Sequence, residues 1–341
     1  MIRRLTRFIR PRFIRHVSRP PEPLDEPPPS APDLVMPASM DIEERVEMGT
    51  WCRDCDILPK VEGAGAVFPD TDGVRVQRMH NGLRVVADAY CGTWTTDLIS
   101  RCHGHHEPQE ERVFHEILAR MPATATMIEL GAWWAYYSLW FLQNHPQRRA
   151  IALEPDAEHR AIGQNNARRN ALAPIFIDGF IGATPSPAEP FTLENSQTVT
   201  IPRRSVPAIM QTHCLKTLDL LHCDAQGAET DVLASCIPLL REGRIRTVVV
   251  STHHHTISGD PLTHQRCLAM VEAAGGMVIA EHDVSESFSG DGLIVARFGP
   301  DQAAWPVIPL TRNRYSTSLF RNPLYDLADL RTSPRSVKGN K

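Results

Sequence analysis

The stretch "MIELGAWWAYYSLWF", residues 127–141, predicts a buried strand, a tight turn at Gly131 and an aromatic-rich helix. A strand, a glycine turn and a helix together form the element with which many α/β proteins hold a nucleotide-like ligand. The turn lacks the further glycines that let a backbone approach a pyrophosphate, and it carries two tryptophans instead. The stretch therefore predicts an α/β fold and raises the question of which ligand accepts such a turn.

The rest of the chain alternates in the same way. Apolar strands are expected at 126–130, 149–154, 175–182, 218–225 and 246–252, and helices at 136–145, 156–171, 228–240 and 261–275. Two further strands, 277–283 and 292–298, follow each other without a helix and are expected to pair as a hairpin. This order predicts a doubly wound, mostly parallel, Rossmann-like sheet with an antiparallel terminal hairpin strand.

Composition narrows the class of protein. The 341 residues are 42% hydrophobic and 22% charged, which is ordinary for a soluble globular protein. A net charge of −4 argues against binding to nucleic acid, and no apolar run is long enough to span a bilayer.

The chain divides into four parts. Residues 1–40 are a basic amphipathic and proline-rich disordered tail, 41–106 an extension with a hairpin turn at "NG", 107–299 the α/β domain and 300–341 a loose C-terminal extension. Residues 1–19 of the tail carry seven arginines, so they either contact an anionic membrane surface or form a solvated arm. We expect a cytoplasmic protein, because the tail lacks the features of a secretory signal.

The eight cysteines are expected to be reduced thiols in that compartment. One spacing, Cys52-x-x-Cys55, is half of a zinc motif. Cys91, or Cys102 with His103, are the distant partners that could complete it. Structural zinc is therefore the alternative to plain thiols.

The residues after the strands predict the ligand, because ligands of doubly wound sheets bind at the carboxyl ends of the strands. Glu154 ends the second strand, 23 residues after Gly131, where a carboxylate can accept both hydroxyls of a ribose. Trp133 and Tyr137 could pack around a cation, or simply fill the core. S-adenosylmethionine has a ribose, an adenine and a sulfonium but no phosphate, and it fits this pattern.

Four segments carry a family resemblance: "ELGAWWAYYSLWF" (129–141), "ALEPDAEHRAIGQNNARRN" (152–170), "LHCDAQGAETDVL" (221–233) and "SGDGLIVARF" (289–298). In this order they resemble the FkbM-type S-adenosylmethionine-dependent methyltransferases. The family pattern Gly-Ala-Asn-x-Gly-x-Tyr-Ser is matched except that Trp133 replaces the asparagine and Ala135 the second glycine. Gln226 replaces the central acid of the family's Asp-x-Glu-Gly-x-Glu block.

The resemblance implies a class I methyltransferase fold, S-adenosylmethionine as cofactor and O-methylation. It also implies that Glu129 and Gly131 lie against the methionine portion of the cofactor and that Glu154 holds the ribose. Asp178, after the third strand, could face the adenine amino group. Trp133 and Tyr137 complete the expected cofactor site.

Methyl transfer to a hydroxyl needs a base, and the candidates follow the fourth and fifth strands. Asp224, Glu229 and His253 are the expected catalytic residues. Asp224, His253 and His255 could alternatively converge on a divalent metal, which would lower the pKa of a bound hydroxyl. Asp291 is expected in the hairpin turn before the last strand, with a place facing the acceptor as the alternative.

The sequence thus predicts a methyltransferase that transfers a methyl group from S-adenosylmethionine to a hydroxyl of a sugar, a glycan or another small metabolite. Two alternatives stay open. One is a non-catalytic binding protein on the same fold, in which Trp133 and Ala135 have abolished catalysis. The other is a metal-dependent enzyme that uses the histidines of residues 253–255.

Overall fold

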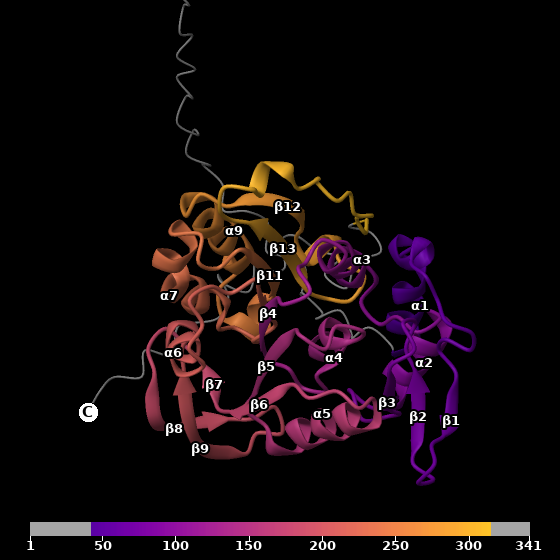
Figure 1. Cartoon of the computed structure of the whole chain (residues 1–341). Helices are drawn as coiled ribbons and strands as arrows, with labels where there is room; N and C mark the ends of the chain where they lie inside the picture. Colours follow the sequence, from indigo (N-terminus) through magenta and orange to yellow (C-terminus); the bar gives the residue numbers. More distant parts are fainter. Residues whose placement is uncertain (1–41, 315–341) are drawn as a thin grey trace, which may run out of the picture. The chain divides into compact units, whose positions relative to one another are not determined.

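A seven-stranded sheet forms the centre of the structure, a computed structural model that describes residues 42–314 (Figure 1). Across the sheet the strands are β6 (Ile175–Asp178), β5 (Arg149–Glu154), β4 (Thr126–Leu130), β10 (Leu220–Cys223), β11 (Thr247–Thr252), β13 (Gly292–Arg297) and β12 (Met277–His282). The neighbours from β6 to β11 pair in parallel, and β13 is antiparallel to both β11 and β12. This is the strand order of the class I methyltransferase fold, and the predicted fold class is confirmed.

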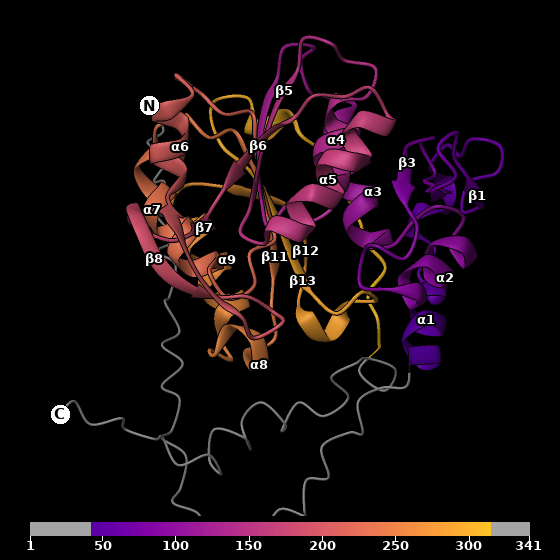
Figure 2. The same cartoon turned by 90° about the horizontal axis from the view of Figure 1, so that it is seen from below.

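Helices cover both faces of this sheet (Figure 2). On one face lie α3 (Pro108–Leu118), α4 (Tyr136–Leu142) and α5 (Ala157–Arg169), and on the other α6 (Val206–Thr212), α7 (Glu229–Arg241) and α9 (Thr263–Ala273). Successive residues of β4 therefore enter different cores. Met127 belongs to the hydrophobic cluster on the α4 side, whereas Ile128 and Leu130 belong to the cluster on the α7 side. Burial on both faces explains why the strands read as continuous apolar runs.

The N-terminal extension packs outside the α3–α5 layer (Figure 2). It consists of α1 (Ile42–Trp51), the 3₁₀ helix η1 (Asp54–Ile57), α2 (Thr93–Arg101) and a small sheet of β1 (Val67–Pro69), β2 (Arg75–Arg78) and β3 (Arg84–Val86). The predicted hairpin at "NG" is confirmed, since β2 and β3 pair antiparallel on either side of that turn. Met79, Val85 and Ile99 belong to the same apolar cluster as α4, so the extension and the domain share a core.

The predicted single strand at 175–182 is divided in two at Gly179. Its second part, β7 (Phe180–Ile181), belongs to a separate sheet with β8 (Ser186–Thr192) and β9 (Thr198–Arg204). Gly179 has a φ of 119°, and a Cβ there would lie 2.4 Å from the carbonyl oxygen of Pro202. Only glycine permits so close an approach of the two backbones, and the chain leaves the main sheet at this point.

The C-terminal extension was predicted to be loose, and for residues 300–314 this is wrong. Ile308 is buried in the cluster on the α4 side, and its N–H donates to the carbonyl oxygen of Ile279 at 2.7 Å. The Asn313 side chain donates to the carbonyl oxygen of Ser287 at 2.9 Å. These contacts attach the segment to the domain next to β12.

The short helices α8 (His255–Ser258), η2 (Val284–Glu286) and η3 (Gln302–Ala304) complete the described elements. The predicted tail, residues 1–40, and the end of the C-terminal extension, residues 315–341, lie outside the described part of the chain. Within residues 42–314, no helix is both long and apolar enough to cross a bilayer.

Candidate active site

A cavity of about 530 Å³ lies over the carboxyl ends of β4, β5 and β10. Two kinds of side chain dominate its wall. The carboxylates are Glu129, Glu154, Asp156, Glu194, Asp224 and Asp291, and the aromatic residues are Tyr90, Trp133, Trp134, Tyr137, Phe180 and Phe191. The size suits a nucleoside-like ligand, and the lining favours a ligand that carries positive charge.

Glu154 ends β5 and is 4% exposed inside this wall. One carboxylate oxygen accepts the backbone N–H of Trp133 at 2.8 Å, and the other accepts the N–H of Asp156 at 2.9 Å. These two bonds hold the carboxylate in place without any ligand. A carboxylate has about four lone-pair sites, so each oxygen can still accept one hydroxyl.

The turn after β4 depends on Gly131, which has a φ of 76°. A Cβ at this position would lie 1.8 Å from the carbonyl oxygen of Asp224, so no other residue fits without moving the backbone. The N–H of Asp224 in turn donates to the carbonyl oxygen of Leu130 at 2.9 Å. The close approach of the two strand ends places Glu129, Gly131 and Asp224 on one wall of the cavity.

Trp133 and Tyr137, both predicted to contact the cofactor, line the cavity. The Trp133 ring stacks on His159 with 3.9 Å between centroids and 11° between planes. Partial burial would lower the pKa of His159, but the Glu154 carboxylate, 3.7 Å from its Nδ1, raises the pKa above its ordinary value. The Tyr137 hydroxyl donates to Glu107 at 2.8 Å, and its ring leans on His222.

Glu129 and His222 form the floor below Tyr137. Burial raises the pKa of Glu129 to about 7, and its carboxylate accepts the N–H of Ser138 at 3.0 Å. Burial alone would lower the pKa of His222, but its 2.6 Å hydrogen bond to Glu110 and the charge of that group raise the pKa to about 9. His222 is therefore an imidazolium at neutral pH.

The three predicted catalytic residues, Asp224, Glu229 and His253, come together at the carboxyl edge of the sheet. Nδ1 of His253 bonds the Glu229 carboxylate, and Nε2 lies 3.2 Å from Asp224 and 3.6 Å from Asp291. Burial would lower the pKa of His253, but the neighbouring carboxylates raise it well above its ordinary value. Nδ1 of His253 therefore faces Glu229 while Nε2 faces both aspartates, so the ring connects the three carboxylates.

Asp291 is the residue that the sequence interpretation placed in a turn, and it lines the cavity. Burial raises its pKa to about 7, while the nearby imidazolium of His253 opposes that rise. Burial also acts to raise the pKa of Asp224, but the bonds to His253 lower it below its ordinary value. Asp224 is therefore the ionised carboxylate of this pair, and Asp291 is the one that can exchange a proton near neutral pH.

Two predicted site residues do not join the others. Asp178 does not line the cavity, because its exposed side chain is turned to Arg204 of β9, 2.8 Å away. His255 was expected to alternate with His253 along a strand, but β11 ends at Thr252 and His255 begins α8. In residues 42–314 a single group of three side chains has metal-ligand spacing, and it contains neither Asp224 nor His253.

Other residues of the wall were not predicted. Phe180, Phe191 and Glu194 come from the small sheet and its hairpin loop, and Arg45 and Tyr90 come from the N-terminal extension. The turn at Asn195-Ser196 between two β-prone runs was the available signal for that hairpin. Nothing in the sequence indicates that the extension reaches the cavity.

No protein-family model matches the chain, and no curated protein matches it either. Among solved structures, a precorrin methyltransferase from Geobacter metallireducens is 15% identical, with a TM-score of 0.37, over 55% of this chain and 88% of that one. An O-methyltransferase from Bacillus cereus, in complex with S-adenosylhomocysteine, is 14% identical, with a TM-score of 0.38, over 56% and 80%. A third similar structure, M. capricolum TrmK in complex with S-adenosylhomocysteine, is 12% identical, with a TM-score of 0.34, over 55% of this chain and 68% of that one.

Proposed function

We propose that this protein transfers a methyl group from S-adenosylmethionine to a hydroxyl group of a sugar, a glycan or another small metabolite. The observation that carries the proposal is the buried Glu154 carboxylate, held at the end of β5 inside a cavity at the carboxyl edge of the sheet. A carboxylate at this point suits the two hydroxyls of a ribose.

The charge of the cavity supports this cofactor over a dinucleotide. Six carboxylic groups line the wall. Its cationic groups are Arg45, which is exposed, and three histidines of raised pKa, His159, His222 and His253, each of which lies against a carboxylate. A pyrophosphate would be repelled there, and the turn after β4 offers it one glycine rather than three. A sulfonium is attracted by the carboxylates and by the faces of the aromatic rings.

When bound, S-adenosylmethionine supplies an electrophilic methyl group on a sulfonium. The part of the protein is to hold donor and acceptor in line and to receive the proton of the acceptor hydroxyl. Alignment is worth about 7–11 kcal/mol in well-oriented systems, and a general base about 3–5 kcal/mol. In this proposal Asp224 or Asp291 receives the proton, and His253, which also bonds Glu229, holds the two aspartates in position; the distances of 3.2 Å and 3.6 Å from its Nε2 to them support this.

Fewer observations bear on the nature of the methyl acceptor. The four segments that resemble FkbM-type methyltransferases favour a hydroxyl acceptor. The β8–β9 hairpin and the N-terminal extension contribute to the cavity wall from outside the seven-stranded core, and we expect them to select the acceptor.

The binding step is tested by calorimetric titration of the full-length protein with S-adenosylmethionine and with S-adenosylhomocysteine. We expect both to bind, and Glu154→Gln to weaken both by about 10- to 100-fold, because hydrogen bonds to a charged group contribute about 1.5–3 kcal/mol. Asp178→Asn is the matched control, since it also removes a carboxylate at a strand end but outside the cavity.

A wild-type protein that binds neither compound contradicts the proposal. So does an unchanged affinity in Glu154→Gln, provided that thermal melting shows the variant to be folded. Equal losses in Glu154→Gln and Asp178→Asn would mean that the cofactor lies elsewhere along the sheet edge.

A further inference from the structure

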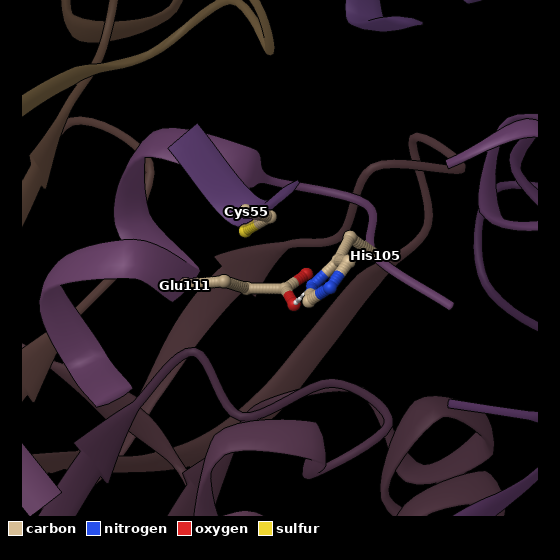
Figure 3. Close-up of side chains that lie close together, drawn as sticks. All are labelled: Cys55, His105 and Glu111. Atoms are coloured by element: carbon tan, nitrogen blue, oxygen red, sulfur yellow. Dashed lines mark hydrogen bonds and ion pairs between the residues drawn. The ribbon is translucent and has the colours of Figure 1, made fainter. Parts of the chain in front are cut away.

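A second group of reactive side chains lies away from the cavity, where the N-terminal extension meets α3. It consists of Cys55 of η1, His105 and Glu111 of α3, whose side chains converge from three segments (Figure 3). Their exposed fractions are 4%, 1% and 0%, and one potential ligand atom of each lies within 4.8 Å of the others. A buried thiol, imidazole and carboxylate at this spacing form a donor set that the methyl-transfer proposal does not use.

The carboxylate of Glu111 is held firmly at the centre of this group. One oxygen accepts the backbone N–H and the ring Nδ1–H of His106, both at 2.8 Å. The other oxygen contacts Nδ1 of His105 at 2.5 Å and accepts the hydroxyl of Tyr136 at 3.3 Å. The position of the second oxygen, Oε2, is therefore fixed by the surrounding elements.

His80 adds an unusual contact to the same oxygen. Its Nδ1 lies 3.2 Å from the carbonyl oxygen of Pro59, which can only accept, so Nδ1 carries the proton. In the neutral ring Nε2 then presents a lone pair, and this atom lies 3.8 Å from Oε2 of Glu111 without a hydrogen-bond partner. Nε2 of the adjacent His105 is also buried without one. A buried nitrogen lone pair without a partner, close to a carboxylate oxygen, is satisfied when a cation binds there.

We propose that Cys55, His105 and Glu111 bind a zinc ion, with His80 as an additional donor. Zinc accepts mixed sulfur, nitrogen and oxygen ligands in a tetrahedral site, whereas magnesium and calcium prefer oxygen ligands alone. The thiolate and the carboxylate balance the two positive charges of the ion, so the buried site is neutral overall. His80 also has the arrangement typical of zinc ligands, because its other ring nitrogen donates to a backbone carbonyl.

Proton balance follows from the contacts. On binding, Cys55 releases the thiol proton that it donates to the carbonyl oxygen of Pro108. His105 keeps one ring proton, on the nitrogen that does not bind zinc, and so stays neutral. The bonds formed are those from zinc to sulfur, nitrogen and oxygen. Nothing is oxidised or reduced.

Such a site would connect two parts of the fold. Cys55 belongs to the extension, whereas Glu111 belongs to the first helix of the domain and also bonds Tyr136 at the start of α4. An ion here holds the extension, and with it Arg45 and Tyr90 of the cavity wall, against the core. All of the ligand atoms are buried, which indicates a structural ion rather than a catalytic one.

The test is metal analysis of the full-length protein, followed by titration of metal-free protein with Co²⁺ alone. We expect about one zinc per chain as purified, and a thiolate-to-cobalt charge-transfer absorption when Co²⁺ binds. Cys55→Ser should abolish that absorption and weaken Co²⁺ binding at least tenfold. Cys52→Ser is the matched control, because Cys52 is also buried and three residues away but lies outside the group.

X-ray absorption of the zinc-loaded wild-type protein keeps the proposal testable if Cys55→Ser does not fold. One sulfur at about 2.3 Å together with nitrogen or oxygen neighbours at about 2.0–2.1 Å supports it. Three results would overturn it. The first is a protein that carries no stoichiometric ion and also fails to bind Co²⁺, and the second is a zinc coordination shell without sulfur. The third is a Cys52→Ser variant that loses the cobalt absorption while Cys55→Ser keeps it.

Discussion

Trp133 and Ala135, in the turn after β4, have φ angles of 40° and 62°. Residues other than glycine and asparagine pay about 1–2 kcal/mol for this left-handed conformation. The pattern typical of FkbM-type methyltransferases has asparagine and glycine at these two places, which are the residues that tolerate it best. Trp133 and Ala135 therefore place strain in the turn, in which the N–H of Trp133 donates to Glu154.

Replacing Ala135 with glycine tests that interpretation. The change relieves about 1–2 kcal/mol of backbone strain but removes a fully buried methyl group worth about 0.8 kcal/mol. We expect the free energy of unfolding in urea to rise by up to about 1 kcal/mol. A clear fall would mean that packing of the methyl group, which faces Gly163 of α5, outweighs the strain.

Helix α5 is also followed by a non-glycine residue in the left-handed conformation. Ala171 follows the helix with a φ of 52°, and the N–H groups of Ala171 and Leu172 donate to the carbonyl oxygens of Arg168 and Ala167. This is the Schellman arrangement, whose left-handed position is usually glycine. Because Ala171 is exposed, its methyl group contributes no packing.

Ala171→Gly is therefore expected to raise the free energy of unfolding by about 1 kcal/mol. Gly275 occupies the equivalent position after α9, with a φ of 88° and open space around the place of a Cβ. The reverse change, Gly275→Ala, should lower stability by a similar amount. Equal effects of the same sign in the two variants would contradict the assignment of strain to these positions.

The strands and helices of the seven-stranded core could be predicted because burial on both faces leaves uninterrupted apolar runs in β4, β5, β10 and β11. Glu154 could be placed because it ends such a run. The β8–β9 hairpin could not, since its strands are mostly half-buried or exposed and contain prolines that weaken the pattern. Its contribution of Phe191 and Glu194 to the cavity wall was missed for the same reason.

Contacts between side chains of distant segments could not be predicted from the sequence. Asp291 lies in a glycine-flanked turn, and only the fold brings it within 3.6 Å of His253. Asp178 ends a strand just as Glu154 does, but Arg204 from the unpredicted β9 holds it at the surface. The sequence pairs Cys55 with Cys52 by spacing, whereas in the structure its thiol lies with the side chains of His105 and Glu111.

Across the described chain, buried ionisable groups extend without a break from the extension to the cavity. Glu111 bonds His106, whose other ring nitrogen lies 3.2 Å from Glu107, and Glu107 accepts the hydroxyl of Tyr137. The Tyr137 ring in turn rests on His222. The state of charge in this network therefore affects both the attachment of the extension and the floor of the proposed cofactor site.

The pH dependence of stability should reveal this network through His222. Its surroundings are Glu110 from α3, Glu129 from β4, Asp224 at the end of β10 and the ring of Tyr137 from α4. The pKa of His222 is about 9 in the folded protein and 6.5 as its ordinary value, so the folded state holds the proton more tightly. The resulting stabilisation is complete below pH 6.5 and is lost as the pH rises towards 9.

We expect the free energy of unfolding, measured in urea at several pH values, to decline between pH 6.5 and pH 9 more steeply in the wild-type protein than in His222→Gln. Glutamine can still donate a hydrogen bond to Glu110 but carries no charge, so its stability should lack this part of the slope. His103→Gln, at an exposed position, is the control and should follow the wild-type curve. Parallel curves for the wild-type protein and His222→Gln would show that the bond between His222 and Glu110 does not bind a proton more tightly in the folded state.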